Sequence, residues 1–355
     1  MGIKIFRYFI KNTALIMMAG VFAFTSAGCG ELDNTKIVLT TGFTGDELFR
    51  IEDLSCTLSE FMVYYVNSKD AYQNSFGEGI WDITTDGESF DEKVKKNCLS
   101  TLAQVKAMNL LARENEIELS DQEISQAKSA AEEYYGSLTS EEISAMKNVT
   151  KDQIENLYKE YALADKLYEY IIKDINPEIS DDEARTITVE QIVFKTYTLD
   201  SQGEKVSVSD SEKSIILNNA RSILDQINEG ADFDVLMEQY NEADEGTVSF
   251  GKGEVDKIIE DAAFDLDSGE VSGIIETNDS YVILKCISTF NREETEANKV
   301  RIVEERKREV FGEQYDAFTA SLSKTLNTDL WNNIKSEESE NVTTTSFFDV
   351  YHNYF

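Results

Sequence analysis

The stretch Gly230-Ala-Asp-Phe-Asp-Val-Leu-Met-Glu-Gln-Tyr-Asn-Glu242 lies at the centre of the segment that decides the fold, residues 186–289. Before it, residues 186–197 alternate in polarity, which indicates a β-strand. Residues 212–229 carry apolar side chains at helical spacing, and Gly230 is a typical helix stop. The apolar stripe consists of Ile216, Ala220, Ile223 and Ile227.

Two shorter helices and a β-hairpin are predicted in the rest of this segment. Residues 274–277 and 281–287, joined by a polar turn at 278–280, are typical of a closing hairpin. The elements together predict an antiparallel sheet packed with helices. The short helices are marked by Phe233, Leu236, Met237 and Tyr240, and by Ile258, Ile259, Ala262 and Ala263.

Three stretches of the segment show a family resemblance: residues 230–242, Phe250-Gly-Lys-Gly253, and Ala262-Ala-Phe-Asp-Leu-Asp-Ser-Gly-Glu-Val-Ser-Gly273. In this order they resemble the parvulin family of peptidyl-prolyl isomerases, in the form found in extracytoplasmic foldases of the PrsA and SurA type. The resemblance implies a parvulin-like isomerase domain over residues 186–290.

The composition excludes several classes of function. The formal net charge is −35 and the pI is about 4.3, which argues against nucleic acid and anionic lipid as electrostatic partners. The sequence contains no phosphate loop, metal cluster or Ser–His–Asp set. We therefore expect neither a cofactor nor a metal site.

The N-terminal segment has the pattern of a bacterial export signal. A basic stretch containing Lys4, Arg7 and Lys11 precedes the apolar residues 13–27. Ser26-Ala-Gly-Cys29 resembles a lipobox, which implies a signal peptide over 1–28, a lipid on Cys29, and anchoring at the outer face of a bacterial cell membrane. An ordinary secretory cleavage near Ala27 is the alternative.

The remaining cysteines offer no catalytic set. Cys56 and Cys98 could form a disulfide, whereas Cys286 lies in a predicted strand as a small buried side chain. The only histidine of the chain is His352, so Cys–His catalysis is not expected.

A helical region follows a polar tether predicted over residues 29–50. Five capping-box patterns between 57 and 153 predict helices in a domain over residues 51–180. A long helix is predicted from 293 to 323, and the aromatic residues of 346–355 should be docked rather than free. The helices are expected near 58–74, 90–115, 121–135, 140–147 and 151–174.

The family resemblance implies how these parts combine. The C-terminal residues 293–355 should pack on the N-terminal helices, which makes one discontinuous all-α chaperone domain of the SurA type around the inserted parvulin-like domain. The expected fold class is α+β.

The chain departs from the parvulin pattern at the residues that carry catalysis. Parvulins surround the twisting prolyl amide with a polar network that contains two histidines; here the corresponding positions hold Gln191 and Val282. The family's Cys or Asp position falls near Glu242 and Ala243.

The proline pocket of the family is altered but remains apolar. Its Met and Phe fall at Val255 and Ile259, and Phe250 and Phe264 complete the candidate substrate-binding set. The simpler interpretation is that these four residues pack in the core, and that Gln191 is a polar residue satisfied by neighbouring backbone.

Three functions remain open. The first is a foldase that holds unfolded or nascent secreted proteins, with isomerase activity weak or lost. The second is a histidine-free isomerase that desolvates and twists the prolyl amide in the apolar pocket around Val255 and Ile259. The third is a non-catalytic surface scaffold. A homodimer through the helices is a further open alternative.

Overall fold

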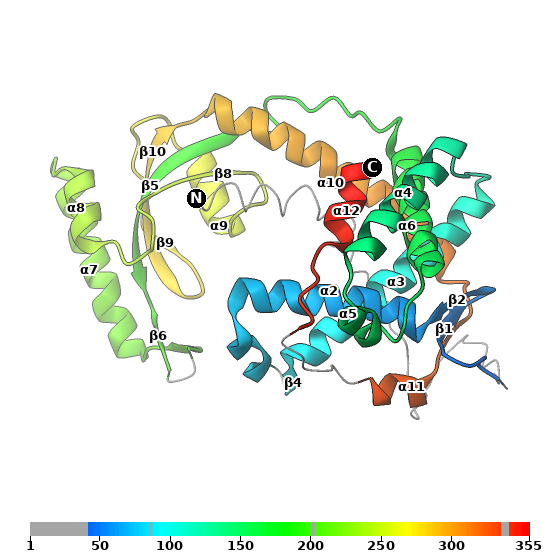
Figure 1. The fold of residues 1–355 in the computed structure, drawn as a ribbon. Helices are drawn as coiled ribbons and strands as arrows, with labels where there is room; N and C mark the ends of the chain where they lie inside the picture. Colours follow the sequence, from blue (N-terminus) through cyan, green and yellow to red (C-terminus); the bar gives the residue numbers. More distant parts are fainter. Residues whose placement is uncertain (1–41, 86, 201–202, 335–340) are drawn as a thin grey trace. The chain divides into compact units, whose positions relative to one another are not determined.

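The computed structural model describes residues 42–85, 87–200, 203–334 and 341–355. The predicted signal peptide and Cys29 lie outside the described residues. The chain divides into a helical unit, residues 1–174 and 308–355, and a sheet unit, residues 175–307 (Figure 1). Among the described residues, no helix combines the length and the apolar composition that crossing a membrane requires.

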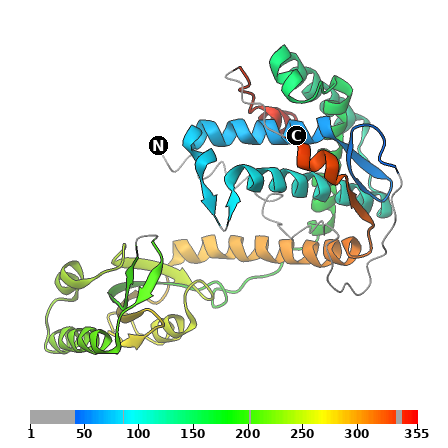
Figure 2. The ribbon, with the colours of Figure 1, turned by 90° about the horizontal axis from the view of Figure 1, so that it is seen from below.

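Five helices form the framework of the helical unit, and their starts follow from local sequence. The hydroxyls of Thr57, Ser120, Thr139 and Thr150 each accept the N3 amide while the N3 side chain returns to the cap, whereas at Ser89 only the first of these bonds forms. Figure 2 shows the helices that begin at Leu58 and Phe90 side by side. The helices are α2 (Leu58–Phe76), α3 (Phe90–Glu114), α4 (Asp121–Ser137), α5 (Ser140–Ala145) and α6 (Lys151–Ile172). The 3-10 helix η1 (Glu78–Asp82) and the short strands β3 (Thr84–Thr85) and β4 (Glu88–Ser89) connect the first two of them.

The helical unit also contains a small sheet that the sequence did not predict. Strand β1 (Glu47–Ile51) pairs antiparallel with β2 (Leu54–Thr57) on one side and with β11 (Lys324–Leu326) on the other. The predicted tether over 29–50 is therefore wrong at its end, because Leu48 and Phe49 are fully buried in this sheet.

The long helix near the C-terminus is also shorter than predicted. Helix α10 (Arg292–Thr319) ends before residue 323, because the chain turns there to pair with β1. Helix α11 (Thr328–Asn333) is a separate short element, and α12 (Phe347–Tyr354) packs against α4 and α2 of the helical unit.

The sheet unit contains a four-stranded antiparallel sheet in the order β8-β5-β10-β9. Its strands are β5 (Thr186–Lys195), β8 (Thr247–Gly251), β9 (Ile275–Glu276) and β10 (Ser280–Ser288). Helices α7 (Asp210–Asn228) and α8 (Phe233–Tyr240) cover one face, and α9 (Lys257–Phe264) covers the other (Figure 1). A hairpin of β6 (Tyr197–Leu199) and β7 (Lys205–Ser207) extends from β5. The α+β prediction with an antiparallel sheet is confirmed.

Turn chemistry in the sheet unit matches the prediction from sequence. Gly230 follows α7 with φ +99°, a conformation that favours glycine, and its amide bonds to the carbonyl of Ile227. Gly251 is required for another reason: a Cβ atom there would lie 2.5 Å from Nδ2 of Asn298.

The three described cysteines are free thiols and are buried, so the structure contains no Cys56–Cys98 disulfide. Cys56 lies in β2, whereas Cys98 lies within α3 and donates to Oγ of Ser68 at 3.6 Å. Burial raises the pKa of the Cys98 thiol to about 12, which makes it unreactive.

Candidate functional site

The face of the sheet covered by α9 brings the predicted substrate-binding residues together. Phe250 is buried in this layer, and Val255, Ile259 and Phe264 pack against it while partly buried. The rings of Phe250 and Phe264 lie 6.3 Å apart in a tilted arrangement. Because Val255, Ile259 and Phe264 are only partly buried, part of this apolar layer remains accessible at the surface; we call it the apolar patch.

Both strand positions that correspond to the family's histidines lie on this same face. In the register of β5 and β10, Val282 is opposite Val193 and Leu284 is opposite Gln191. Residues that are paired in this way, and their diagonal neighbours, project to one side of a sheet. Gln191 and Val282 are thus diagonal neighbours beside the apolar patch.

Neither residue is set up for acid–base chemistry. Val282 is 1% exposed and belongs to the apolar layer under α9. Gln191 uses its side-chain Nε2 to donate to the carbonyl oxygen of Glu245 at 3.0 Å. The amide group therefore holds a loop in place, as the simpler interpretation of this residue predicts.

The loop that contains Glu242 and Ala243 lies along the edge of β5. The main-chain N–H of Glu242 donates to the carbonyl of Val193 at 3.0 Å, and its carboxylate accepts from the N–H of Lys195 at 2.6 Å. Ala243 donates its N–H to Oδ1 of Asn241. The Glu242 carboxylate has a structural partner here and does not project into the apolar patch as a free base.

Asn241 is a site residue that sequence reasoning missed. Its Oδ1 accepts the N–H of Val193 at 3.0 Å, and its Nδ2 donates to the carbonyl oxygens of Ala243 and Glu245. Asparagine commonly forms such local bonds in loops, but only the tertiary structure shows that this one bonds to β5.

An arginine at the start of the sheet was also missed. The guanidinium carbon of Arg185 lies 4.8 Å from the ring centroid of Phe264, within the range of a cation–π contact. This contact fixes one wall of the apolar patch. It could not be read from sequence, because residues 185 and 264 come from different elements.

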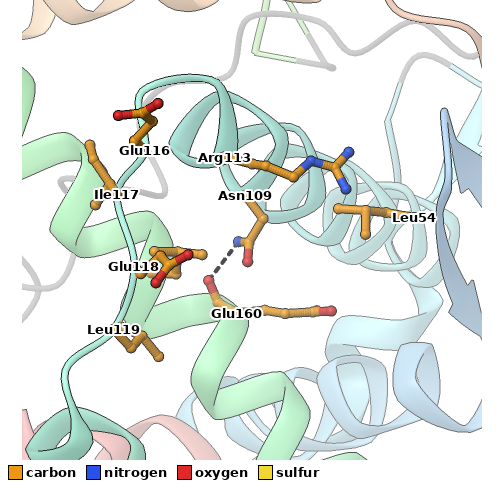
Figure 3. Close-up of a pocket in the computed structure, with 9 residues that line it drawn as sticks. Leu54, Asn109, Arg113, Glu116, Ile117, Glu118, Leu119 and Glu160 are labelled. Atoms are coloured by element: carbon orange, nitrogen blue, oxygen red, sulfur yellow. Dashed lines mark hydrogen bonds between the residues drawn. The ribbon is translucent and has the colours of Figure 1, made fainter.

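A cavity lies in the helical unit, between α3, α6 and the segment that joins α3 to α4 (Figure 3). Its volume is about 560 Å³, and its walls combine apolar side chains with acidic ones. Nδ2 of Asn109 donates to the main-chain oxygen of Glu160 at 2.7 Å across its floor. The lining residues are Leu54, Asn109, Arg113, Glu116, Ile117, Glu118, Leu119, Glu160 and Leu163.

Two ion pairs lie at this cavity. Nζ of Lys106 lies 2.6 Å from Oε1 of Glu160, and Arg113 forms two bonds with Asp53. Burial raises the pKa of Glu160, and the neighbouring Lys106 ammonium opposes that shift. The pair ties α3 to α6, so we assign it a structural role. The described residues contain no group of three or more side chains arranged to hold a metal ion.

The comparisons with known proteins agree with the geometry of the sheet unit. Residues 194–288 match the model of the rotamase family, described as the PPIC-type PPIase domain. The sheet unit contains a parvulin-type domain. The matched range includes Val282, and Gln191 lies just before it in β5.

Curated relatives extend the similarity beyond the parvulin-type domain. The chain is 26% identical over 288 residues to the foldase protein PrsA of Caldanaerobacter subterraneus subsp. tengcongensis, covering 77% of this chain and 84% of that protein. It is 21% identical over 320 residues to the foldase protein PrsA of Clostridium acetobutylicum, covering 82% and 88%. A crystal structure of PrsA from Bacillus cereus aligns with a TM-score of 0.36 at 21% identity, over 76% of this chain and 97% of that one.

Proposed function

We propose that this chain is a membrane-anchored extracytoplasmic foldase that holds unfolded secreted proteins and has weak or no prolyl isomerase turnover. One observation supports the proposal that prolyl isomerase turnover is weak or absent. The parvulin-type domain keeps its apolar patch, but Val282 is 1% exposed in an apolar layer and the amide of Gln191 is bonded to the Glu245 carbonyl.

The physical argument concerns the rotational barrier of the prolyl bond, about 18–20 kcal/mol. An apolar patch can hold the proline ring and remove water from the amide, but a polar network is needed to stabilise the twisted state. Gln191 and Val282 do not supply that network. Binding without turnover therefore fits these residues better than rapid isomerisation does.

The anchor rests on sequence. Cys29 follows small residues after an apolar stretch, and a diacylglycerol on its thiol would retain the protein at the outer face of the membrane. Replacing Cys29 by Ser should move the protein from the membrane fraction into the medium or the soluble fraction. Retention of the Cys29→Ser variant in washed membranes would refute the lipid anchor.

The test of function compares two activities in one protein that begins at residue 30. Cis–trans exchange of Xaa-Pro peptides measures turnover, and suppression of aggregation of an unfolded protein measures holding. We expect suppression without turnover. Val255→Ser and Ile259→Ser report on the apolar patch, and Val235→Ser, at a residue 59% exposed on α8, is the matched control.

The outcomes separate the alternatives. A histidine-free isomerase is the second candidate, because the apolar patch is retained. It would be identified by turnover that is abolished by the Val255 and Ile259 substitutions but is unaffected by the Val235 substitution. A protein that neither isomerises peptides nor suppresses aggregation would be a non-catalytic scaffold.

A further inference from the structure

Aromatic side chains of three helices enclose α12 in the helical unit. The ring of Phe347 stacks on Tyr158 at 4.5 Å between centroids and meets Tyr64 and Tyr134 edgewise or tilted at 5.4 and 5.3 Å. Tyr351 meets Tyr161 at 4.6 Å. We call this set, from α2, α4 and α6, the aromatic groove; Figure 1 shows α12 beside these helices.

Polar side chains at the edges of the groove bond to the main chain of the segment inside it. Oδ1 of Asn67 accepts the N–H of Phe347 at 3.1 Å, and the hydroxyl of Tyr158 donates to the Phe347 carbonyl at 2.8 Å. Farther along, Nε2 of Gln126 donates to the carbonyl of Tyr354, and Glu142 accepts the N–H of Thr343 at 3.2 Å.

This pattern of contacts is that of a peptide site. The main-chain bonds are independent of sequence, since every non-proline residue offers the same N–H and carbonyl groups. The ring contacts add a preference for aromatic side chains at the positions of Phe347, Phe348 and Tyr351. A groove with both properties can accept another segment of the same pattern.

The resident segment covers a carboxylate whose burial works against permanent docking. The hydroxyl of Tyr351 donates to Oδ2 of Asp165 at 2.6 Å, in a site where burial raises the pKa of that carboxyl to about 6. At neutral pH the docked segment therefore covers a carboxylate whose charge opposes burial. Undocking gives this carboxylate back to water.

We propose that the aromatic groove is a second client-binding site, that residues 343–355 are its resident occupant, and that unfolded segments of the pattern aromatic–aromatic–x–x–aromatic displace that occupant. This inference rests on the proposed foldase function and adds a client-binding site in the helical unit to the apolar patch of the parvulin-type domain. Because the resident segment is tethered, it competes at an effective concentration in the millimolar range. Short peptides should therefore bind the intact chain weakly.

The experiment follows amide hydrogen exchange in the full chain, with and without a synthetic peptide of the sequence Ser346–Phe355. We expect faster exchange in residues 347–354 when the peptide is present, with unchanged protection in α6. A control peptide in which Ser replaces the residues at the positions of Phe347, Phe348 and Tyr351 should have no effect.

Two matched variants in α12 make the test quantitative. Tyr351→Phe removes the bond to partly buried Asp165, and Tyr354→Phe removes an exposed bond to Glu133 at 2.8 Å. Leaving the Asp165 carboxylate without its donor should raise opening of α12, and the apparent affinity for the peptide, roughly tenfold. Tyr354→Phe should change neither.

Each outcome decides the proposal separately from the isomerase question. Selective opening of α12 by the peptide supports it whether or not the protein turns over prolyl bonds. Exchange of α12 only through global unfolding, or selective opening without peptide binding, overturns it. Concentration-dependent dimers that exchange residues 343–355 between copies would also overturn it, because the second occupant would then be another copy of this chain.

Discussion

Asp165 should make the stability of the helical unit depend on pH between about 4 and 7. Its carboxyl lies on α6 and accepts the Tyr351 hydroxyl at 2.6 Å. Burial raises its pKa from 3.8 to about 6, the Tyr351 bond partly offsets that rise, and nearby Glu169 adds to it. The folded state therefore holds this proton to higher pH than the unfolded state does.

The sign and size of the effect follow from linkage. A carboxyl with a raised pKa in the folded state stabilises the protein below its unfolded pKa, and that stability is lost as pH rises through the folded pKa. The shift from 3.8 to about 6 corresponds to about 3 kcal/mol in total at 1.36 kcal/mol per pKa unit. Roughly 1.4 kcal/mol of this falls between pH 5 and pH 7.5.

Tryptophan fluorescence provides a selective assay, because both tryptophans of the chain, Trp81 and Trp331, lie in the helical unit. Urea unfolding at pH 5 and pH 7.5 should show a larger free energy of unfolding at pH 5. Asp165→Asn should reduce the difference between the two pH values by roughly 1.4 kcal/mol. Exposed Asp152 on the same helix supplies the control, Asp152→Asn.

His352 must be separated from this effect. Burial lowers its pKa below 6.5, so its contribution has the opposite sign and is lost as pH falls through that range. Because both proteins contain His352, comparing wild type with Asp165→Asn at both pH values cancels the contribution of His352 to the free energy of unfolding. An equal pH dependence in the two proteins would refute the assignment of a raised pKa to Asp165.

Three further substitutions test the packing of the two units. Phe347→Ala should lower the free energy of unfolding of the helical unit by about 3–5 kcal/mol in urea titrations, because Phe347 is only 1% exposed. Truncating the partly buried Phe348 to Ala should lower that free energy by less. Gly251→Ala should lower the thermal stability of the sheet unit by about 1–3 kcal/mol, measured by circular dichroism, because the new Cβ would meet Nδ2 of Asn298. Val282→His should destabilise the sheet unit by about 1–3 kcal/mol, because it places an imidazole in an apolar layer. It should not restore turnover in the peptide assay. A stable and active Val282→His protein would contradict our account of this face.

Much of the secondary structure is local and could be read from sequence. The caps at Thr57, Ser120, Thr139 and Thr150 place their own helix starts, because each bond joins residues three apart. Gly230 likewise ends α7 through its own positive φ. The departure from the parvulin pattern at Gln191 and Val282 was also visible in the sequence, because it concerns only which residue type stands at each position.

The tertiary structure alone decided which distant segments meet. Strand β1 forms because Leu326 pairs with Phe49, and Asn241 becomes a site residue because the edge of β5 passes beside it. The aromatic groove exists only where α2, α4 and α6 bring tyrosines from three helices around Phe347. Such contacts depend on loop closure and shared burial over long sequence separations, so no local pattern of residues encodes them.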